Sequence, residues 1–300
     1  MIEKKYKISF VIPAYNSEDT LLEAVDSIFD GNFEDGDEVI IVNDSSNDNT
    51  KIVAENILIK YKPFIKLINN EQNKGCPASR NVGISDSKNE LIFNLDSDNI
   101  LFPGSIKKLK KELIEQNADV SSFQEYHYFK TNAKKITHKW ICNTGILTLA
   151  DFLSGLINPG PGGNFLYKKE IWSKIGGYWE YGKGLHEAWG YALKLLINGA
   201  KFIVVPNTFY FHRYSHQSLF MRENARGGES ANITNKFIEP ALELLDTESR
   251  EFVKKNNNWF DYMNKKPLYL KNRPLGKNGK LVYTSPIKQI LYTVKKILLK

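Results

Sequence analysis

The stretch Leu91-Ile-Phe-Asn-Leu-Asp-Ser-Asp98 places two aspartates directly after a short apolar run. An apolar run without strict alternation predicts a strand that is covered on both faces. Side chains two positions apart in an extended chain face the same side, about 6.5 Å apart along the strand. Asp96 and Asp98 would therefore repel each other unless a cation lies beside them.

Magnesium or manganese suits such a pair, because both cations prefer oxygen ligands and share them with phosphate groups. A solvated, aspartate-rich turn has the same sequence, and the pattern Asp-x-Asp alone favours that simpler interpretation. The neighbouring sequence is needed to decide between a metal site and a solvated turn.

Strand and helix patterns alternate around this stretch. Apolar runs predict strands over residues 8–13, 38–42, 64–68 and 91–95. Helical spacing predicts helices after Ser17, which is a candidate N-cap, and over residues 51–62, 78–84 and 106–115. Strands that alternate with crossover helices indicate an α/β fold with a doubly wound, mostly parallel sheet and flanking helices.

Polar residues follow three of the four strands. These clusters are Pro13-Ala-Tyr-Asn16, Asn43-Asp-Ser-Ser46 and Asp96-Ser-Asp-Asn99. Ligands of open parallel sheets bind beyond the carboxyl ends of the strands, where these clusters would meet. Turn formation explains any one of them, since Asn, Asp and Ser favour turns, but it explains all three together less well.

The composition is that of a globular protein, with 42% apolar and 25% charged residues in a chain of 300. Cys76 and Cys142 follow no metal-binding or redox spacing, and no apolar run approaches the length of a membrane span. The first residues contain no secretory segment. We therefore expect a cytoplasmic protein without a disulfide framework.

The net charge of +7 is concentrated near the carboxyl end. From Lys265 onward the chain has ten basic and no acidic residues, so the preceding part has fewer basic residues than its 34 acidic ones. A mildly acidic body is poorly suited to binding nucleic acid over a broad face. We expect no nucleic-acid partner.

Taken together, these stretches resemble glycosyltransferase family 2, which has the GT-A fold. The resemblance covers about residues 8–212, and it lies in an ordered set of motifs: Val11-Ile-Pro-Ala-Tyr-Asn16, Val42-Asn-Asp-Ser-Ser-Asn-Asp-Asn-Thr50, Asn73-Lys-Gly-Cys-Pro-Ala-Ser-Arg-Asn81, Leu95-Asp-Ser-Asp98, Ile175-Gly-Gly-Tyr178 and the segment from Glu187 to Gly199. A GT-A catalytic domain over residues 1–217 is implied, with a nucleotide-sugar half over about 1–100 and an acceptor half over 101–217. A basic, helical C-terminal extension would occupy residues 218–300.

The resemblance implies a role for several residues of the donor site. Pro13, Ala14 and Tyr15 would line the nucleotide pocket, and Asp44 would accept the N–H of the base, which favours uracil. Arg80 would approach the base or the diphosphate, where its planar fork suits phosphate oxygens. Asp96 would lie near the ribose and the metal.

The implied metal is Mn²⁺ or Mg²⁺. Asp98 would bind it directly, together with Asp96. His212 lies where many family members have a metal-binding histidine, and His216 is a second candidate. A lone histidine beside aromatic residues is as often a packed side chain, so both interpretations of His212 stay open.

The catalytic base is where the chain departs from the family pattern. Family members usually have a Glu-Asp pair at the start of a helix, whereas here Ala188 replaces the Asp after Glu187. Glu187 is our first candidate for the base, and His186 is the second, since its ordinary pKa lies near neutrality. A plain role for Glu187, stabilising the helix dipole, is the structural alternative.

The resemblance also implies the reaction and its partners. We expect a metal-dependent inverting glycosyltransferase that moves a sugar from a nucleotide-sugar, with UDP favoured, to a glycan or lipid-linked acceptor in bacterial surface polysaccharide synthesis. Gly162, Gly163 and Asn164 would lie near the acceptor. Because of Ala188, a non-catalytic member that binds nucleotide-sugar or glycan as a partner subunit is the alternative.

The last residues form an amphipathic pattern. An apolar face is flanked by lysines; the apolar residues are Ile287, Ile290, Leu291, Val294, Ile297 and Leu298. Such a helix can lie on the inner face of an anionic membrane. Packing on the catalytic domain or a homodimer contact would require the same pattern, so all three remain open.

Overall fold

The computed structural model describes residues 6–142, 144–149, 152, 164–180, 187–214, 241–247, 250–251 and 280–282. Its strands are β1 (Ile8–Ala14), β2 (Glu38–Asn43), β3 (Ile65–Asn69), β4 (Leu91–Asn94), β5 (Ile100–Leu101), β6 (Val120–Phe129), β7 (His138–Ile141), β8 (Gly145–Leu147), β9 (Phe165–Lys168), β10 (Phe202–Arg213) and β11 (Lys280–Val282). Its helices are α1 (Leu21–Phe29), α2 (Thr50–Lys60), α3 (Cys76–Asp86), α4 (Ser105–Glu115), α6 (Lys169–Ile175) and α7 (Glu187–Ile197).

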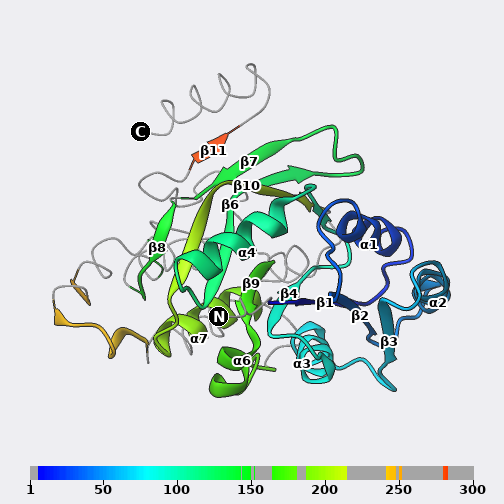
Figure 1. The fold of residues 1–300 in the computed structure, drawn as a ribbon, viewed down its shortest axis with the longest axis horizontal. Coiled ribbons are helices and arrows are strands. Elements are labelled where there is room, and N and C mark those ends of the chain that lie inside the picture. Colours follow the sequence, from blue (N-terminus) through cyan, green and yellow to red (C-terminus); the bar gives the residue numbers. More distant parts are fainter. Residues whose placement is uncertain are drawn as a thin grey trace, which may run out of the picture.

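A single mixed sheet runs through the molecule (Figure 1), in the order β11-β7-β6-β9-β4-β1-β2-β3. Its first half, β3-β2-β1-β4, is parallel throughout. In the second half β9 is antiparallel to both β4 and β6, while β10 is parallel to β6. The predicted α/β class is confirmed, and the parallel pairing inferred for most of the sheet is concentrated in the half that precedes residue 100.

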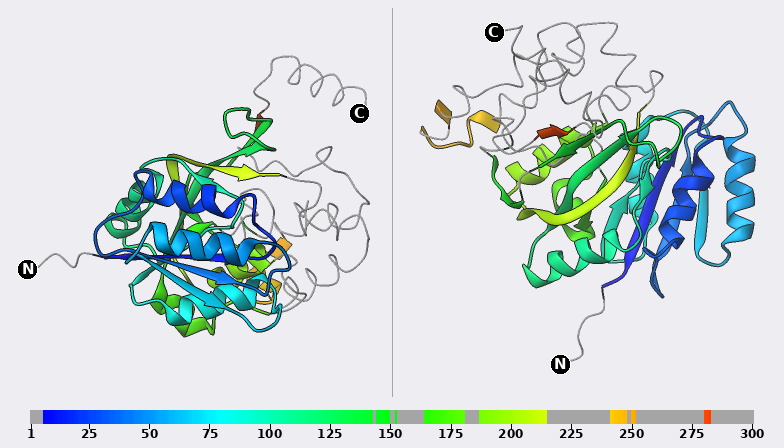
Figure 2. Two further views of the ribbon diagram at one scale, coloured as in Figure 1. Left: turned by 90° about the vertical axis from the view of Figure 1, so that its right-hand side faces the viewer. Right: turned by 90° about the horizontal axis from the view of Figure 1, so that it is seen from above.

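Helices cover both faces of this sheet (Figure 2, left). Apolar residues of α1, α2 and α4 pack with Phe10 and Ile12 of β1 in one buried cluster. Val11, which points to the opposite face, packs with residues of α3, α6 and α7 in a second cluster. Burial on both faces explains why β1 and β2 are almost continuously apolar, as is typical of parallel strands.

The first helix begins later than the sequence predicts. Ser17 does not cap it, because α1 begins at Leu21 and the Ser17 carbonyl closes a turn by accepting the N–H groups of Thr20 and Leu21. The Ser17 N–H donates to Thr50 Oγ1, and the Ser17 hydroxyl bonds to Ser97. Ser17 therefore joins loops instead of capping a helix.

Several predictions concern residues that the structure does not describe. They are the domain boundary at residue 217, the glycines Gly162 and Gly163, the histidines His186 and His216, and the amphipathic pattern after residue 285. In the described part of the chain, no helix is long and apolar enough to cross a bilayer.

Gly83 lets α3 lie directly on the sheet. A Cβ atom at this position would lie 2.5 Å from Val11 Cγ1 and 3.0 Å from Val42 Cγ2. A helical Gly→Ala change ordinarily stabilises by about 1 kcal/mol. We expect Gly83→Ala to lower the free energy of unfolding by about 1–3 kcal/mol instead, because the overpacking outweighs this gain.

Chemical denaturation of the purified protein measures this effect. Ser85→Ala, at an exposed position of the same helix, is the matched control and should change stability little. A Gly83→Ala variant as stable as the wild type would show that α3 can move away from β1 and β2 at no cost.

Candidate active site

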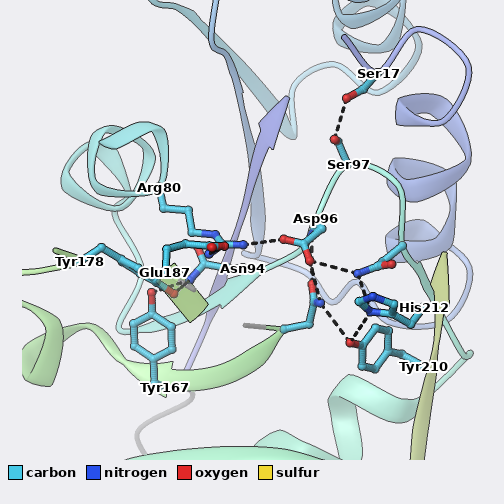
Figure 3. Close-up of polar contacts among 12 residues, drawn as sticks. Ser17, Arg80, Asn94, Asp96, Ser97, Tyr167, Tyr178, Glu187, Tyr210 and His212 are labelled. Atoms are coloured by element: carbon cyan, nitrogen blue, oxygen red, sulfur yellow. Dashed lines mark hydrogen bonds and ion pairs between the residues drawn. The ribbon is translucent and has the colours of Figure 1, made fainter. Parts of the chain in front are cut away.

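The loops that follow β1, β2 and β4 meet at the carboxyl edge of the parallel strands, as the sequence predicts. The Asn16 N–H donates to Ser46 Oγ at 3.1 Å, and the Asn47 N–H donates to Asn16 Oδ1 at 2.9 Å. The hydroxyl groups of Ser17 and Ser97 are 2.7 Å apart, which connects the first loop to the aspartate loop, residues 96–99 (Figure 3). Three clusters distant in sequence thus form one site.

A buried arginine lies at the centre of this site (Figure 3). Arg80 is on α3, and its side chain is only 1% exposed. Its Nη2 donates to Asp96 Oδ1 at 2.5 Å, and its Nη1 donates to Glu187 Oε1 at 2.8 Å. Arg80 therefore joins the end of β4 to the first residue of α7.

Glu187 is brought to the site by this ion pair. Its side chain is 15% exposed, and burial raises the pKa of its carboxyl while Arg80 counteracts part of the increase. Arg80 bonds to Oε1, and no described residue bonds to Oε2. Glu187 therefore has one oxygen fixed and one oxygen with lone pairs to spare.

A tyrosine cluster packs behind Arg80. The guanidinium carbon lies 5.3 Å from the centre of the Tyr178 ring. Asn94, the last residue of β4, donates to the hydroxyls of Tyr167 and Tyr178 at 2.7 and 2.8 Å. Tyr178 also stacks on Tyr191 of α7, with ring centres 3.7 Å apart. These aromatic contacts keep water from the inner side of the arginine.

Asn164 bonds to Asp96 through both ends of its side-chain amide. Its Oδ1 accepts the Asp96 N–H at 2.9 Å, and its Nδ2 donates to Asp96 Oδ2 at 3.1 Å. The side chain is buried, and Nδ2 also lies 3.3 Å from the Tyr210 hydroxyl. The Asn164 amide therefore holds Asp96 in place, and its proximity to an acceptor stays a prediction.

The charges around Asp96 and Asp98 are compatible with a bound divalent cation. Burial and the neighbouring charge of Asp96 raise the pKa of Asp98 from 3.8 to about 7. The charged form of Asp98 is thus disfavoured first by burial and then by Asp96, and a divalent cation beside it would stabilise that charged form. His212 Nδ1 lies 3.0 Å from the Tyr210 hydroxyl. In the tautomer with the proton on Nδ1, this bond would orient the imidazole ring, as the hydrogen-bond partners of metal-binding histidines do.

These groups do not form a complete metal cage. Within the described residues, no three His, Cys, Asp or Glu side chains are close enough together to hold a metal ion. One or two protein carboxylates combined with substrate phosphates are, however, the usual arrangement for Mg²⁺. Asp96, Asp98 and His212 therefore suit a cation that a bound diphosphate helps to hold.

Asp44 has protein partners on both oxygens. Its Oδ1 accepts from Asn70 Nδ2 and from the Lys74 N–H, and its Oδ2 accepts from the Gly75 N–H at 2.8 Å. The side chain is 2% exposed. Asp44 thus anchors the loop that leads into α3, and its contact with a base stays a prediction.

The remaining predicted donor residues lie at the end of β1. Pro13 and Ala14 are buried, whereas Tyr15 is 44% exposed. The Tyr15 hydroxyl accepts from Asn47 Nδ2 at 3.3 Å. This leaves the Tyr15 ring as a surface on which a planar base could stack.

Sequence patterns do not reveal three of the contacts in this site. The contacts of Asn164 with Asp96, of Ser17 with Ser97 and of Arg213 with the aspartate loop join residues at least 68 positions apart. No spacing rule relates residues so distant, so only the folded chain shows them.

The comparisons agree with this geometry. The family model for glycosyl transferase family 2 matches residues 9–176, which is more than half of the chain. The fold and site define an α/β protein with carboxylate-bearing loops at the carboxyl edge of a parallel sheet. The chain belongs to glycosyltransferase family 2, and the prediction of a glycosyltransferase is confirmed at the level of the family.

Two relatives illustrate the similarity. Glycosyltransferase GlyG of Streptococcus pneumoniae is 31% identical over 121 residues, 40% of this chain and 40% of GlyG. The poly(ribitol-phosphate) beta-N-acetylglucosaminyltransferase TarP of Staphylococcus aureus is 32% identical over 116 residues, 38% of this chain and 35% of TarP. The matches thus span about two fifths of these relatives' lengths.

Solved structures share the fold at low identity. S. aureus TarS 1-349 in complex with UDP-GlcNAc superposes with a TM-score of 0.66 and 16% identity, covering 96% of this chain and 79% of that one. Mannosyltransferase PcManGT from Pyrobaculum calidifontis, in complex with GDP-Man and Mn²⁺, gives 0.63 and 15%, covering 99% and 81%.

The raised pKa of Asp98 predicts that this residue lowers the free energy of unfolding in a pH-dependent way. A carboxyl whose pKa is higher in the folded state destabilises that state increasingly as the pH rises from about 4 to about 7. Without metal at pH 8, Asp98→Asn should therefore raise the free energy of unfolding by about 1–2 kcal/mol, a value discounted for partial solvent contact. The gain should vanish near pH 4.

Denaturation series at several pH values, with a chelator present, measure the gain. Asp35→Asn, which changes an exposed aspartate, is the control and should show no such pH profile. A constant difference between wild type and Asp98→Asn at every pH would contradict the assignment.

Arg80→Met should destabilise the protein by about 3 kcal/mol near neutral pH, because it leaves Asp96 and Glu187 together without their cation. Adding Glu187→Gln to Arg80→Met removes one unpaired charge and should recover part of the loss. Unfolding midpoints of the wild type, both single variants and the double variant complete the cycle. If the losses simply add, the ion pair contributes nothing.

Proposed function

We propose that the chain is a metal-dependent, inverting glycosyltransferase that moves a sugar from a UDP-sugar to a hydroxyl group of a glycan or lipid-linked acceptor. One observation supports this most directly. Arg80 connects Asp96, at the end of the donor-half strand β4, to Glu187, at the start of α7 in the acceptor half. In this proposal, a carboxylate from each half would face the region where donor and acceptor meet.

The donor half supplies the nucleotide-sugar contacts in this proposal. Pro13, Ala14 and Tyr15 would line the base and ribose, Asp44 would meet the base, and Asp96 would lie near the ribose. UDP is favoured because one relative, WfgD of Escherichia coli, is named for a UDP-Glc donor, and TarS, which shares the fold, is solved with UDP-GlcNAc.

A divalent cation, Mn²⁺ or Mg²⁺, held by Asp96, Asp98 and His212, would supply neutralising charge to the donor diphosphate. The neighbouring side chains hold its ligands in place. Asn164 and Asn99 both donate to Asp96 Oδ2 at 3.1 Å, and Arg80 occupies Oδ1. The orientation of Asp96 is thereby set before any substrate binds, which lowers the cost of ordering it.

Glu187 would act as the base through Oε2. The acceptor oxygen forms a bond to the anomeric carbon as the bond from that carbon to the diphosphate oxygen breaks. The acceptor proton passes to Glu187, and the diphosphate leaves with the electron pair. This single displacement inverts the anomeric centre. The raised pKa of Glu187 makes it a stronger base than an exposed carboxylate.

Names of relatives support the acceptor class. TarP is named for a poly(ribitol-phosphate) acceptor and WfgD for a diphosphoundecaprenol-linked sugar. We propose a similar role for this chain in the cytoplasm, with contact to the inner membrane face through the C-terminal basic segment. A homodimer contact through that segment is its competing interpretation.

A panel of nucleotide-sugars, with and without Mn²⁺, tests the proposal through turnover and thermal shift. Glu187→Gln should lower kcat by about 10²–10⁴-fold and leave donor binding nearly unchanged, because proton transfer is lost while an amide oxygen can still accept from Arg80 Nη1. Glu55→Gln, on the exposed face of α2, should match the wild type.

Two outcomes would redirect the proposal. Donor binding without turnover of any nucleotide-sugar by the wild type would favour the non-catalytic binding member that Ala188 suggests. Stabilisation by GDP-sugars and not by UDP-sugars would overturn the role of Asp44.

A further inference from the structure

Arg213, the last residue of β10, contacts the aspartate loop twice. Its Nε donates to the Asp98 carbonyl oxygen at 2.9 Å, and its backbone N–H donates to Asn99 Oδ1 at 2.9 Å. Main chain and side chain of one residue thus bond to two consecutive residues of the loop.

The other nitrogens of Arg213 bond to two further segments. Nη1 donates to the Lys130 carbonyl at 3.3 Å, at the end of β6, and Nη2 forms an ion pair with Glu23 of α1. The guanidinium carbon lies 4.5 Å from the centre of the Phe129 ring. The Arg213 side chain is 12% exposed, and its bond to the Asp98 carbonyl is partly buried, whereas its bonds to Lys130 and Glu23 lie at the surface.

These contacts use the geometry of an arginine. A planar fork donates in several fixed directions at once, whereas an ammonium group is a single point on a flexible stem. Each acceptor of Arg213 belongs to a different part of the chain: α1, the aspartate loop and the end of β6. The guanidinium is therefore committed to the protein instead of to a ligand.

The bond to the Asp98 carbonyl restricts the metal site directly. It fixes the peptide unit between Asp98 and Asn99, and this sets the direction in which the Asp98 side chain leaves the backbone. On the other side, the Ser17 hydroxyl holds Ser97. The loop is thus restrained from both sides, although it belongs to no strand or helix.

We propose that Arg213 is a positioning residue that holds the 96–99 loop in its binding conformation, and thereby sets the affinity of the site for a divalent cation and for the donor. The effect on the loop stands alone, whereas the effect on cation and donor affinity rests on the proposed function.

Hydrogen–deuterium exchange of the full chain tests the effect on the loop without metal or substrate. In Arg213→Gln, the amides of residues 96–99 should exchange at least about tenfold faster than in the wild type, because the loop loses its bonds to the guanidinium. Arg213→Lys keeps the charge but not the planar guanidinium, so its loop amides should exchange at a rate between those of the wild type and Arg213→Gln. Unchanged exchange in Arg213→Gln overturns the proposal.

Arg250→Gln is the matched control. Arg250 also donates to backbone carbonyls, those of Leu242, Glu243 and Leu245, but far along the chain from the loop. The Arg250→Gln variant should exchange the amides of residues 96–99 at the wild-type rate. Slow exchange of β1 and β2 verifies that each variant is folded. If Arg213→Gln does not fold, Glu23→Gln decides: faster loop exchange supports the proposal, and unchanged exchange overturns it.

Mn²⁺ titration calorimetry and donor kinetics test the effect on affinity. Arg213→Gln should weaken Mn²⁺ binding and raise the donor KM by about tenfold, or 1.4 kcal/mol, and leave the acceptor KM unchanged. If a variant with faster loop exchange binds Mn²⁺ and donor as tightly as the wild type, the proposed effect of Arg213 on affinity is overturned. A wild type that binds no Mn²⁺ would instead overturn the metal-dependent function itself, while loop exchange still decides the role of Arg213.

Discussion

The ion pairs of Arg80 with Asp96 and Glu187 are the interaction on which the site depends. An arginine that is 1% exposed would be costly to bury alone, and two carboxylates beside each other would be equally costly without a cation. The positive charge of Arg80 offsets the cost of burying the two carboxylates, and the carboxylates offset the cost of burying Arg80. Because the three residues come from α3, from the end of β4 and from α7, this compensation also joins the two halves of the molecule.

The mixed sheet explains how the halves can be joined. The parallel strands β1, β2 and β4 bring their following loops to one edge, and β9 continues the sheet so that Asn164, just before it, reaches Asp96. Strand β10 then carries His212 and Arg213 to the far side of the same loop. Groups from both halves of the sheet thus surround residues 96–99.

Local sequence was sufficient for the first half of the fold. The buried runs of β1, β2 and β4 and the helices between them follow from patterns that act over a few residues, and the polar clusters after these strands do meet. The start of α1 was misplaced, because the Ser17 groups bond to Thr50 and Ser97 across the fold. Distant partners had displaced a local capping preference.

Strand patterning and motifs are short-range properties, so they were enough to assign the α/β class, the family and the residue types of the site. How these residues are used depends on the folded chain. In the folded chain, the Asn164 amide bonds to Asp96, both oxygens of Asp44 accept hydrogen bonds from the protein, and Arg80 lies between two carboxylates. Burial and hydrogen bonding depend on which distant segments meet, and no local pattern records that.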